Sequence, residues 1–225
     1  MKIVSFNFTR KSFELLKELE ENNNKDWYDE HREDFETYLR SPFAEVLERA
    51  SDRLDETATP LIGSARTMFR QNRDIRFSKD KSPYNTQISG VMTPSGTKAE
   101  KSGLLYLQLD ATGGMLACGF YQLRASELAP IRDRMLEKPK EFSKVLKDLE
   151  TADLSLSNED KLKSMPRGYQ DDSSHEHAEC IKLKSLIAKT SLPKSIWLEG
   201  EILERIVTYS IGCASLLAFG NAARE

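Results

Sequence analysis

The chain has 225 residues, of which 39% are hydrophobic and 31% charged, so it can bury a core and still present a well-solvated surface. Intrinsic disorder requires few apolar residues together with a large charge imbalance, and this composition has neither. The formal net charge of −3 counts against a dedicated nucleic-acid-binding protein, because the binding domains of such proteins are usually basic.

The first third of the sequence has the hydrophobic spacing of amphipathic helices. Phe13 and Leu16 begin such a pattern, and the run Asn22-Asn23-Asn24 predicts an interruption, because asparagine tolerates left-handed geometry and caps helices. A second helix is expected from near Lys25. Ser41-Pro42 predicts a further helix start, since serine is a good N-cap and proline suits the first helical position.

The middle third changes to the short apolar runs that are typical of strands. Gly103 to Asp110 and Gly114 to Gln122 flank a glycine-containing loop, which predicts a β-hairpin. Gln87 to Thr93 and Thr67 to Phe77 are further strand candidates. We therefore expect a mostly antiparallel sheet of about four strands or more between about residues 65 and 122.

The last third returns to helical spacing. Helices are expected at Ser126 to Leu136, Pro139 to Leu149, Glu176 to Ala188 and Trp197 to Phe219. Helices, then strands, then helices predict an α+β fold in which N-terminal and C-terminal helices flank a central sheet. Because no linker is long enough to force a division, we expect residues 1–225 to form a single domain.

Several classes of protein and site are disfavoured. Cys118, Cys180 and Cys213 lie far apart without C-x-x-C spacing, so we interpret them as small apolar fillers. His175-Glu176-His177 lacks the spacing of a helical metal site, and the usual glycine-rich phosphate loops are missing, so we expect neither metal nor cofactor. No apolar run suits a signal peptide or a membrane span, which predicts a cytoplasmic protein without a membrane partner; a nuclear location stays open.

The stretch from Arg70 to Tyr84 is rich in cations although the chain as a whole is acidic. Its cations are Arg70, Arg73, Arg76, Lys79 and Lys81, and its anions are Asp74 and Asp80. Arginine grips phosphate or carboxylate through two parallel hydrogen bonds, and a loop that leaves a strand is a common place for a ligand. We therefore predict a site for a phosphate- or carboxylate-bearing small molecule, with the aspartates orienting the arginine forks.

A strand through this stretch would separate its side chains by alternation. Phe69, Ile75 and Phe77 would face the core, and the intervening charged residues would face solvent or a cleft. Further members of the site are predicted among aromatic and cationic residues elsewhere, namely Trp27, Tyr84, Arg167 and Tyr169.

Two alternatives to the ligand site stay open. The stretch is also compatible with a solvated sheet face crossed by Arg–Asp pairs. It is equally compatible with an interaction module that docks an acidic protein or, less expected, a nucleic acid without turnover. Whether the protein is an enzyme and whether it is oligomeric are not decided by these patterns.

A family resemblance rests on segments spread over nearly the whole chain. They are Asn22 to Trp27, Arg32, Pro42-Phe43, Arg70, Arg73 to Tyr84, Pro166 to Tyr169 and Leu183 to Ser185. In these segments the sequence resembles the family called domain of unknown function 2461, found in bacteria and fungi. Asn85 and Gln87 depart from it, standing where the family often has Lys and a His or Asn. The resemblance implies one α+β domain and no particular activity.

Overall fold

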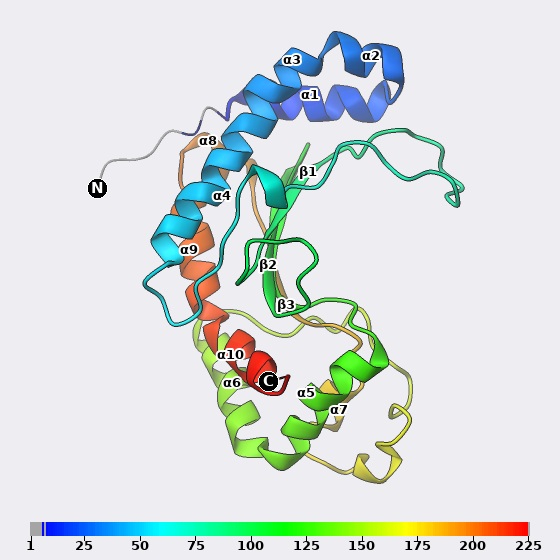
Figure 1. Ribbon diagram of the computed structural model, residues 1–225, viewed down its shortest axis with the longest axis vertical. Coiled ribbons are helices and arrows are strands. Elements are labelled where there is room, and N and C mark those ends of the chain that lie inside the picture. Colours follow the sequence, from blue (N-terminus) through cyan, green and yellow to red (C-terminus); the bar gives the residue numbers. More distant parts are fainter. Residues whose placement is uncertain (1–5, 7, 225) are drawn as a thin grey trace.

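The computed structural model describes residue 6 and residues 8–224. Its centre is a four-stranded antiparallel sheet in the order β1-β2-β3-β4 (Figure 1). The strands are β1 (Ile88–Met92), β2 (Leu104–Asp110), β3 (Gly113–Phe120) and β4 (Leu186–Ser191). Helices from both ends of the chain lie along one side of the sheet, so the predicted α+β class with a flanked antiparallel sheet is confirmed.

The predicted hairpin is confirmed as β2 and β3. Along β2, Leu105, Leu107 and Leu109 are fully buried, and the residues between them are partly exposed, so one face of the strand joins the core. The turn requires glycine at Gly113, because its φ of 137° is disfavoured for other residues and a Cβ there would lie 2.0 Å from the Leu192 carbonyl oxygen.

Two strand assignments differ from the prediction. Thr67 to Phe77 is not a strand: it makes only isolated bridges, of Met68 with Gly90 and of Asn72 with Tyr84. Glu176 to Ala188 is not a helix, because it holds only the short α7 (Ala178–Ile181) before β4 begins. The apolar run at its end is drawn into the sheet because it pairs with the open edge of β3.

The N-terminal helices are α1 (Arg10–Glu21), α2 (Lys25–Glu30) and α3 (Arg32–Phe35). The asparagine break is confirmed: Asn22 ends α1, and the Asn24 side chain caps α2 by accepting a hydrogen bond from the Trp27 amide at 3.0 Å.

The predicted helix start at Ser41-Pro42 coincides with the first residues of α4, but it does not follow a break in the helix, and Ser41 is not its N-cap. The chain continues from α3 through a π-helical turn (Glu36–Arg40) into α4 (Ser41–Leu54) without leaving helical geometry. Proline has no N–H for the carbonyl oxygen one turn earlier, and that oxygen, on Tyr38, instead accepts a hydrogen bond of 2.8 Å from the buried Ser12 hydroxyl of α1. The π-helical turn and a neighbouring helix together accommodate the interior proline.

The predicted helices of the last third are partly confirmed. Two appear as α5 (Ala125–Glu137) and α6 (Pro139–Thr151), but Trp197 to Phe219 is divided among α8 (Lys194–Leu198), α9 (Ile202–Gly212) and α10 (Ala214–Ala222). Residues 121–185 form one excursion between β3 and β4; we call this part, with α5, α6 and α7, the helical lobe (Figure 1).

Cys118 and Cys213 are buried free thiols at the boundary between β3 and α9. The Cys213 thiol and burial raise the pKa of Cys118 well above its ordinary value, which suits an inert, protonated filler. Within the described part of the chain, no helix alone has the length and apolarity to cross a membrane; α9 and α10, bent by 47°, meet that test only as a pair.

Candidate functional site

Residues 70–84, which we call the arm, project from the edge of the sheet as a long loop (Figure 1). Two of its arginines pair with aspartates of the arm, and Lys81 donates to the Ile75 carbonyl oxygen at 2.9 Å. Arg76 holds Asp74 through two hydrogen bonds, of 2.9 Å from Nε and 2.6 Å from Nη2. Arg73 pairs with Asp80 and also donates to the Ser82 carbonyl oxygen at 3.1 Å. These contacts are the Arg–Asp network that was one of the alternatives.

The arm aspartates are held in their charged form. Hydrogen bonds from the Ser82 hydroxyl and amide, followed by the pairing with Arg73, bring the pKa of Asp80 far below its ordinary value. The Arg76 side chain and amide lower the pKa of Asp74 in the same way. Both carboxylates are exposed, so their pairs tie the loop together and contribute little to the global stability.

Within the described part of the chain, no more than two of the five cations line the groove at the base of the arm. Arg70 and Arg73 line a groove of about 510 Å³ at the base of the arm, beside Asp74 and Tyr106. Arg76, Lys79 and Lys81 are not among the residues that line it. The groove is therefore a less cationic site than the sequence predicted.

The prediction that Phe69 and Phe77 face the core is wrong. The Phe77 side chain is 95% exposed at the far part of the arm, and Phe69 is 40% exposed. Alternation fails because this stretch is not a strand; the guanidinium of Arg76 lies over the Phe77 ring at 5.8 Å instead.

The base of the arm is anchored by aromatic and amide contacts. Tyr84 is buried and stacks on Tyr28 with ring centroids 4.1 Å apart. The Asn23 side chain accepts from the Tyr84 amide at 3.1 Å and donates to its carbonyl oxygen at 2.9 Å. Trp27 stacks on His31 at 4.1 Å and does not line the groove. Tyr84 and Trp27 thus have evident structural roles here.

Arg167 and Tyr169 belong to the helical lobe, residues 121–185, and this lobe lies at the opposite end of the molecule from the arm (Figure 1). The Tyr169 hydroxyl donates to Asp133 Oδ1 at 2.6 Å, and burial together with this carboxylate raises the pKa of the phenol. The structure therefore does not bring these two residues to the basic stretch but places them beside a second cavity.

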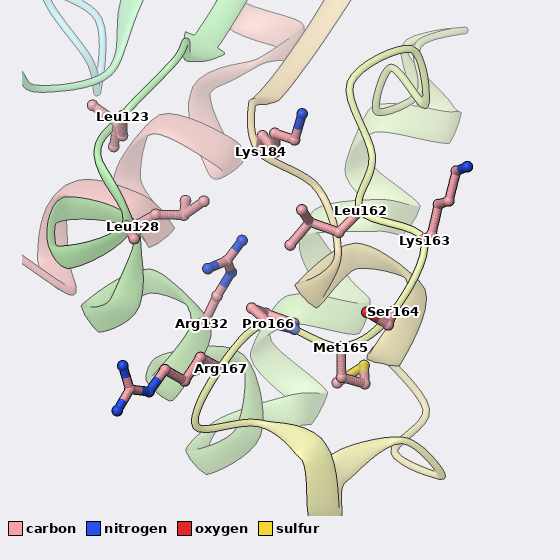
Figure 2. Close-up of a pocket in the computed structure, with 11 residues that line it drawn as sticks. Leu123, Leu128, Arg132, Leu162, Lys163, Ser164, Met165, Pro166, Arg167 and Lys184 are labelled. Carbon is pink, nitrogen blue, oxygen red and sulfur yellow. The ribbon is translucent and has the colours of Figure 1, made fainter.

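This second cavity, the Arg132 cavity, has a volume of about 460 Å³ and lies between α5 and the loop that precedes Gly168 (Figure 2). Its walls are mostly apolar, and its polar groups are mostly cationic. The lining residues are Leu123, Ala125, Leu128, Arg132, Leu162, Lys163, Ser164, Met165, Pro166, Arg167 and Lys184.

Arg132 is the cation that reaches among the apolar walls (Figure 2). The residue is only 5% exposed, and its Nη2 donates to the Leu183 carbonyl oxygen at 2.9 Å. Its Nε has no hydrogen-bond partner, and within the described residues no carboxylate oxygen lies within 4.0 Å of the guanidinium. Burial lowers the pKa of Arg132, but arginine stays charged at any physiological pH.

The other cations of the cavity either have a carboxylate partner or point away from its interior. Lys184 pairs with Asp160 at 2.9 Å. Figure 2 shows the charged ends of Lys163 and Arg167 pointing outward from the mouth. The interior therefore holds one uncompensated positive charge, and the rim adds positive potential around it.

Metal chemistry has little to build on in the described residues, among which no group of three or more His, Cys, Asp or Glu could hold an ion. The His177 imidazole is buried, with Nε2 2.9 Å from the Pro139 carbonyl oxygen, and His175 Nδ1 accepts from the His177 amide at 3.1 Å. The contact with Pro139 connects the residue before α7 to the first residue of α6.

Arg132 was missed at the level of the sequence, although a signal for it exists. Leu128, Ile131, Arg132 and Met135 follow helical spacing, so the arginine stands on the buried face of its helix. A charged residue on the apolar face of a helix requires a counterion, hydrogen-bond acceptors or a bound ligand, because burying an unpaired charge is costly.

The chain is thus an α+β protein with a cationic, apolar-walled cavity in a helical lobe. Residues 11–219 match the profile of the family described as conserved hypothetical protein DUF2461, and the chain belongs to this family. A comparison with curated proteins found no match.

Proposed function

We propose that the protein binds an anionic small molecule in the Arg132 cavity, with the Arg132 guanidinium as the recognising group. The observation that carries the proposal is the unpartnered Nε of a 5% exposed arginine, with no carboxylate nearby in the described residues. A buried charge without a counterion is unfavourable, and a bound anion would remove that cost while accepting charge-assisted hydrogen bonds.

The surroundings of Arg132 favour this reading. Lys163 and Arg167 add positive potential at the rim, which would draw an anion toward the opening. The volume of about 460 Å³ lies within the ~300–1,000 Å³ range of small-molecule sites. Arg167, one of the predicted site residues, lines this cavity and not the groove at the base of the arm.

Binding without turnover is the function that the lining supports. Of the described residues around the cavity, Ser164 alone carries a hydroxyl, and none carries a carboxylate or an imidazole. Acid–base or nucleophilic catalysis requires such groups within hydrogen-bond reach of the substrate. The cavity therefore offers recognition, with no evident base to activate a nucleophile.

The test is a thermal-shift titration with sodium phosphate and sodium acetate at fixed ionic strength. An anion present at 100 times its dissociation constant adds about 2.7 kcal/mol to the free energy of unfolding. We expect at least one of these anions to stabilise the wild type and neither to stabilise Arg132→Met, which keeps an unbranched apolar stem and lacks the guanidinium. Arg70→Met, in the groove at the base of the arm, is the matched control and should behave as the wild type. Loss of the effect in Arg70→Met alone would move the site back to the arm.

A second candidate function is docking of an acidic partner by the arm. The observation that favours it is the 95% exposed Phe77, which stands among the exposed cations Arg76, Lys79 and Lys81. The test is fluorescence anisotropy with a labelled acidic peptide and a labelled DNA single strand. Binding that falls in both Phe77→Ser and Lys79→Glu would support docking; equal binding by all three proteins would exclude it.

A further inference from the structure

We infer that the ligand of the Arg132 cavity is a small apolar monocarboxylate, that is, one carboxylate on a hydrocarbon body. This inference rests on the proposed function and names the chemical class of its ligand. It follows from the number of charges inside the cavity, the donors left on the guanidinium and the nature of the walls.

The charge inside the cavity fits an anion of charge −1. Arg132 is the buried cation, whereas Lys184 already has Asp160 at 2.9 Å. A phosphate monoester carries about −1.5 to −2 at neutral pH and would leave negative charge uncompensated in a largely apolar space. A carboxylate neutralises the one guanidinium and leaves no excess.

The free donors of Arg132 suit a planar, two-oxygen acceptor. Only Nη2 is engaged within the described residues, by the Leu183 carbonyl oxygen, and Nε is unpartnered. A carboxylate accepts two parallel hydrogen bonds from one edge of a guanidinium. Phosphate sites usually add several backbone amides or hydroxyls, and Ser164 is the one hydroxyl residue in the described lining.

The walls suit a hydrocarbon body. Five of the lining residues that surround Arg132 in Figure 2 have apolar side chains: Leu123, Leu128, Leu162, Met165 and Pro166. A ligand that is only a charge, such as acetate, would leave these surfaces in water. Covering them with methylene groups adds favourable burial in proportion to the apolar area removed from solvent.

The experiment uses probes that differ from sodium hexanoate in chain length or in the charged group: acetate, hexanol, hexyl phosphate and inorganic phosphate. Each is titrated by calorimetry at fixed ionic strength. We expect hexanoate to bind at least about tenfold more tightly than acetate, because each buried methylene contributes. It should also bind at least about tenfold more tightly than hexanol, which lacks the charge, and than hexyl phosphate.

Two variants separate the parts of the site. Arg132→Met should abolish hexanoate binding, and Leu162→Ser should weaken hexanoate at least about fivefold while leaving acetate unchanged, because only the hydrocarbon wall is altered. Circular dichroism and the unfolding midpoint check that each variant is folded. Should Arg132→Met fail to fold, Arg132→Lys keeps the charge, loses the fork and should still weaken hexanoate.

The outcomes distinguish the two proposals. Hexyl phosphate binding as tightly as hexanoate, with loss in Arg132→Met, overturns the monocarboxylate class and leaves the anion cavity intact. Binding of hexanoate that is equal in wild type and Arg132→Met, or no binding of any anion, overturns both. Hexanol binding as well as hexanoate overturns the role of the charge.

Discussion

Ser12 supplies the hydrogen bond that Pro42 cannot give, and this exchange yields a quantitative prediction. Pro42 stands inside a continuous helix, so the Tyr38 carbonyl oxygen has no N–H four residues later. The fully buried Ser12 hydroxyl donates to that oxygen at 2.8 Å and accepts from the Thr9 amide at 3.1 Å. Ser12→Ala removes both bonds and leaves almost no cavity.

The expected cost follows from the groups left without partners. A buried polar group that loses its only partner costs about 1–3 kcal/mol, so Ser12→Ala should lower the free energy of unfolding by about that amount. In a Pro42→Ala background the residue regains an N–H for Tyr38, and the cost should fall by about 1 kcal/mol. Urea denaturation of the four proteins gives this coupling energy, provided that the slope of the transition is unchanged.

Ser41→Ala is the matched control, because the Ser41 hydroxyl makes an exposed hydrogen bond to Glu36. Its effect should stay within about 0.5 kcal/mol. Equal costs for Ser12→Ala and Ser41→Ala would show that the buried bond contributes nothing. An identical cost of Ser12→Ala in both backgrounds would refute the link to the proline.

Three further expectations concern the lobe and the arm. Phe142→Ala should cost about 3–5 kcal/mol in urea denaturation, because the ring is fully buried against Phe219; a cost below ~1 kcal/mol would contradict its burial. Phe77→Ala should change stability by less than about 0.5 kcal/mol, and a larger loss would place its ring against the core. The pKa of Asp80 is lower in the folded protein than its value of about 4 in the unfolded chain. The contribution of the Asp80 carboxylate to the order of the arm is therefore fully present above about pH 4, and it is lost as the pH falls through the lower pKa of the folded state. The NMR signal of the Ser82 amide should therefore be constant from about pH 7 to 5 and shift in more acidic solution; a shift near neutral pH would contradict this.

The parts of the fold that depend on neighbours in the sequence could be predicted. The asparagine break, the hairpin of β2 and β3, and the helices α5 and α6 are specified by local spacing, capping and turn chemistry. Strand β4 could not be predicted in this way. Its short apolar run suits a helix or a strand, and only the distant edge of β3 selects the strand.

The position of the proposed cavity could not be predicted from the sequence. An excess of arginine and lysine is visible in the sequence of the arm, but sequence cannot tell whether these cations face a ligand or the aspartates beside them. Arg73 and Arg76 face Asp80 and Asp74. Arg132 escaped notice because a lone arginine in a helix is usually a surface residue, and its burial depends on the packing of the loop before Gly168.

The long excursion between β3 and β4 has a consequence for the protein while it is being synthesised. The meander β1-β2-β3 leaves the ribosome first, and residues 121–185 follow before the strand that pairs with β3. At roughly 5–20 residues per second, the nascent chain therefore carries an unpaired strand edge for several seconds. An open edge next to buried positions such as Leu116 and Cys118 invites pairing with other chains. Nascent chains arrested before residue 186 should thus require chaperones and aggregate more readily than chains released after residue 191.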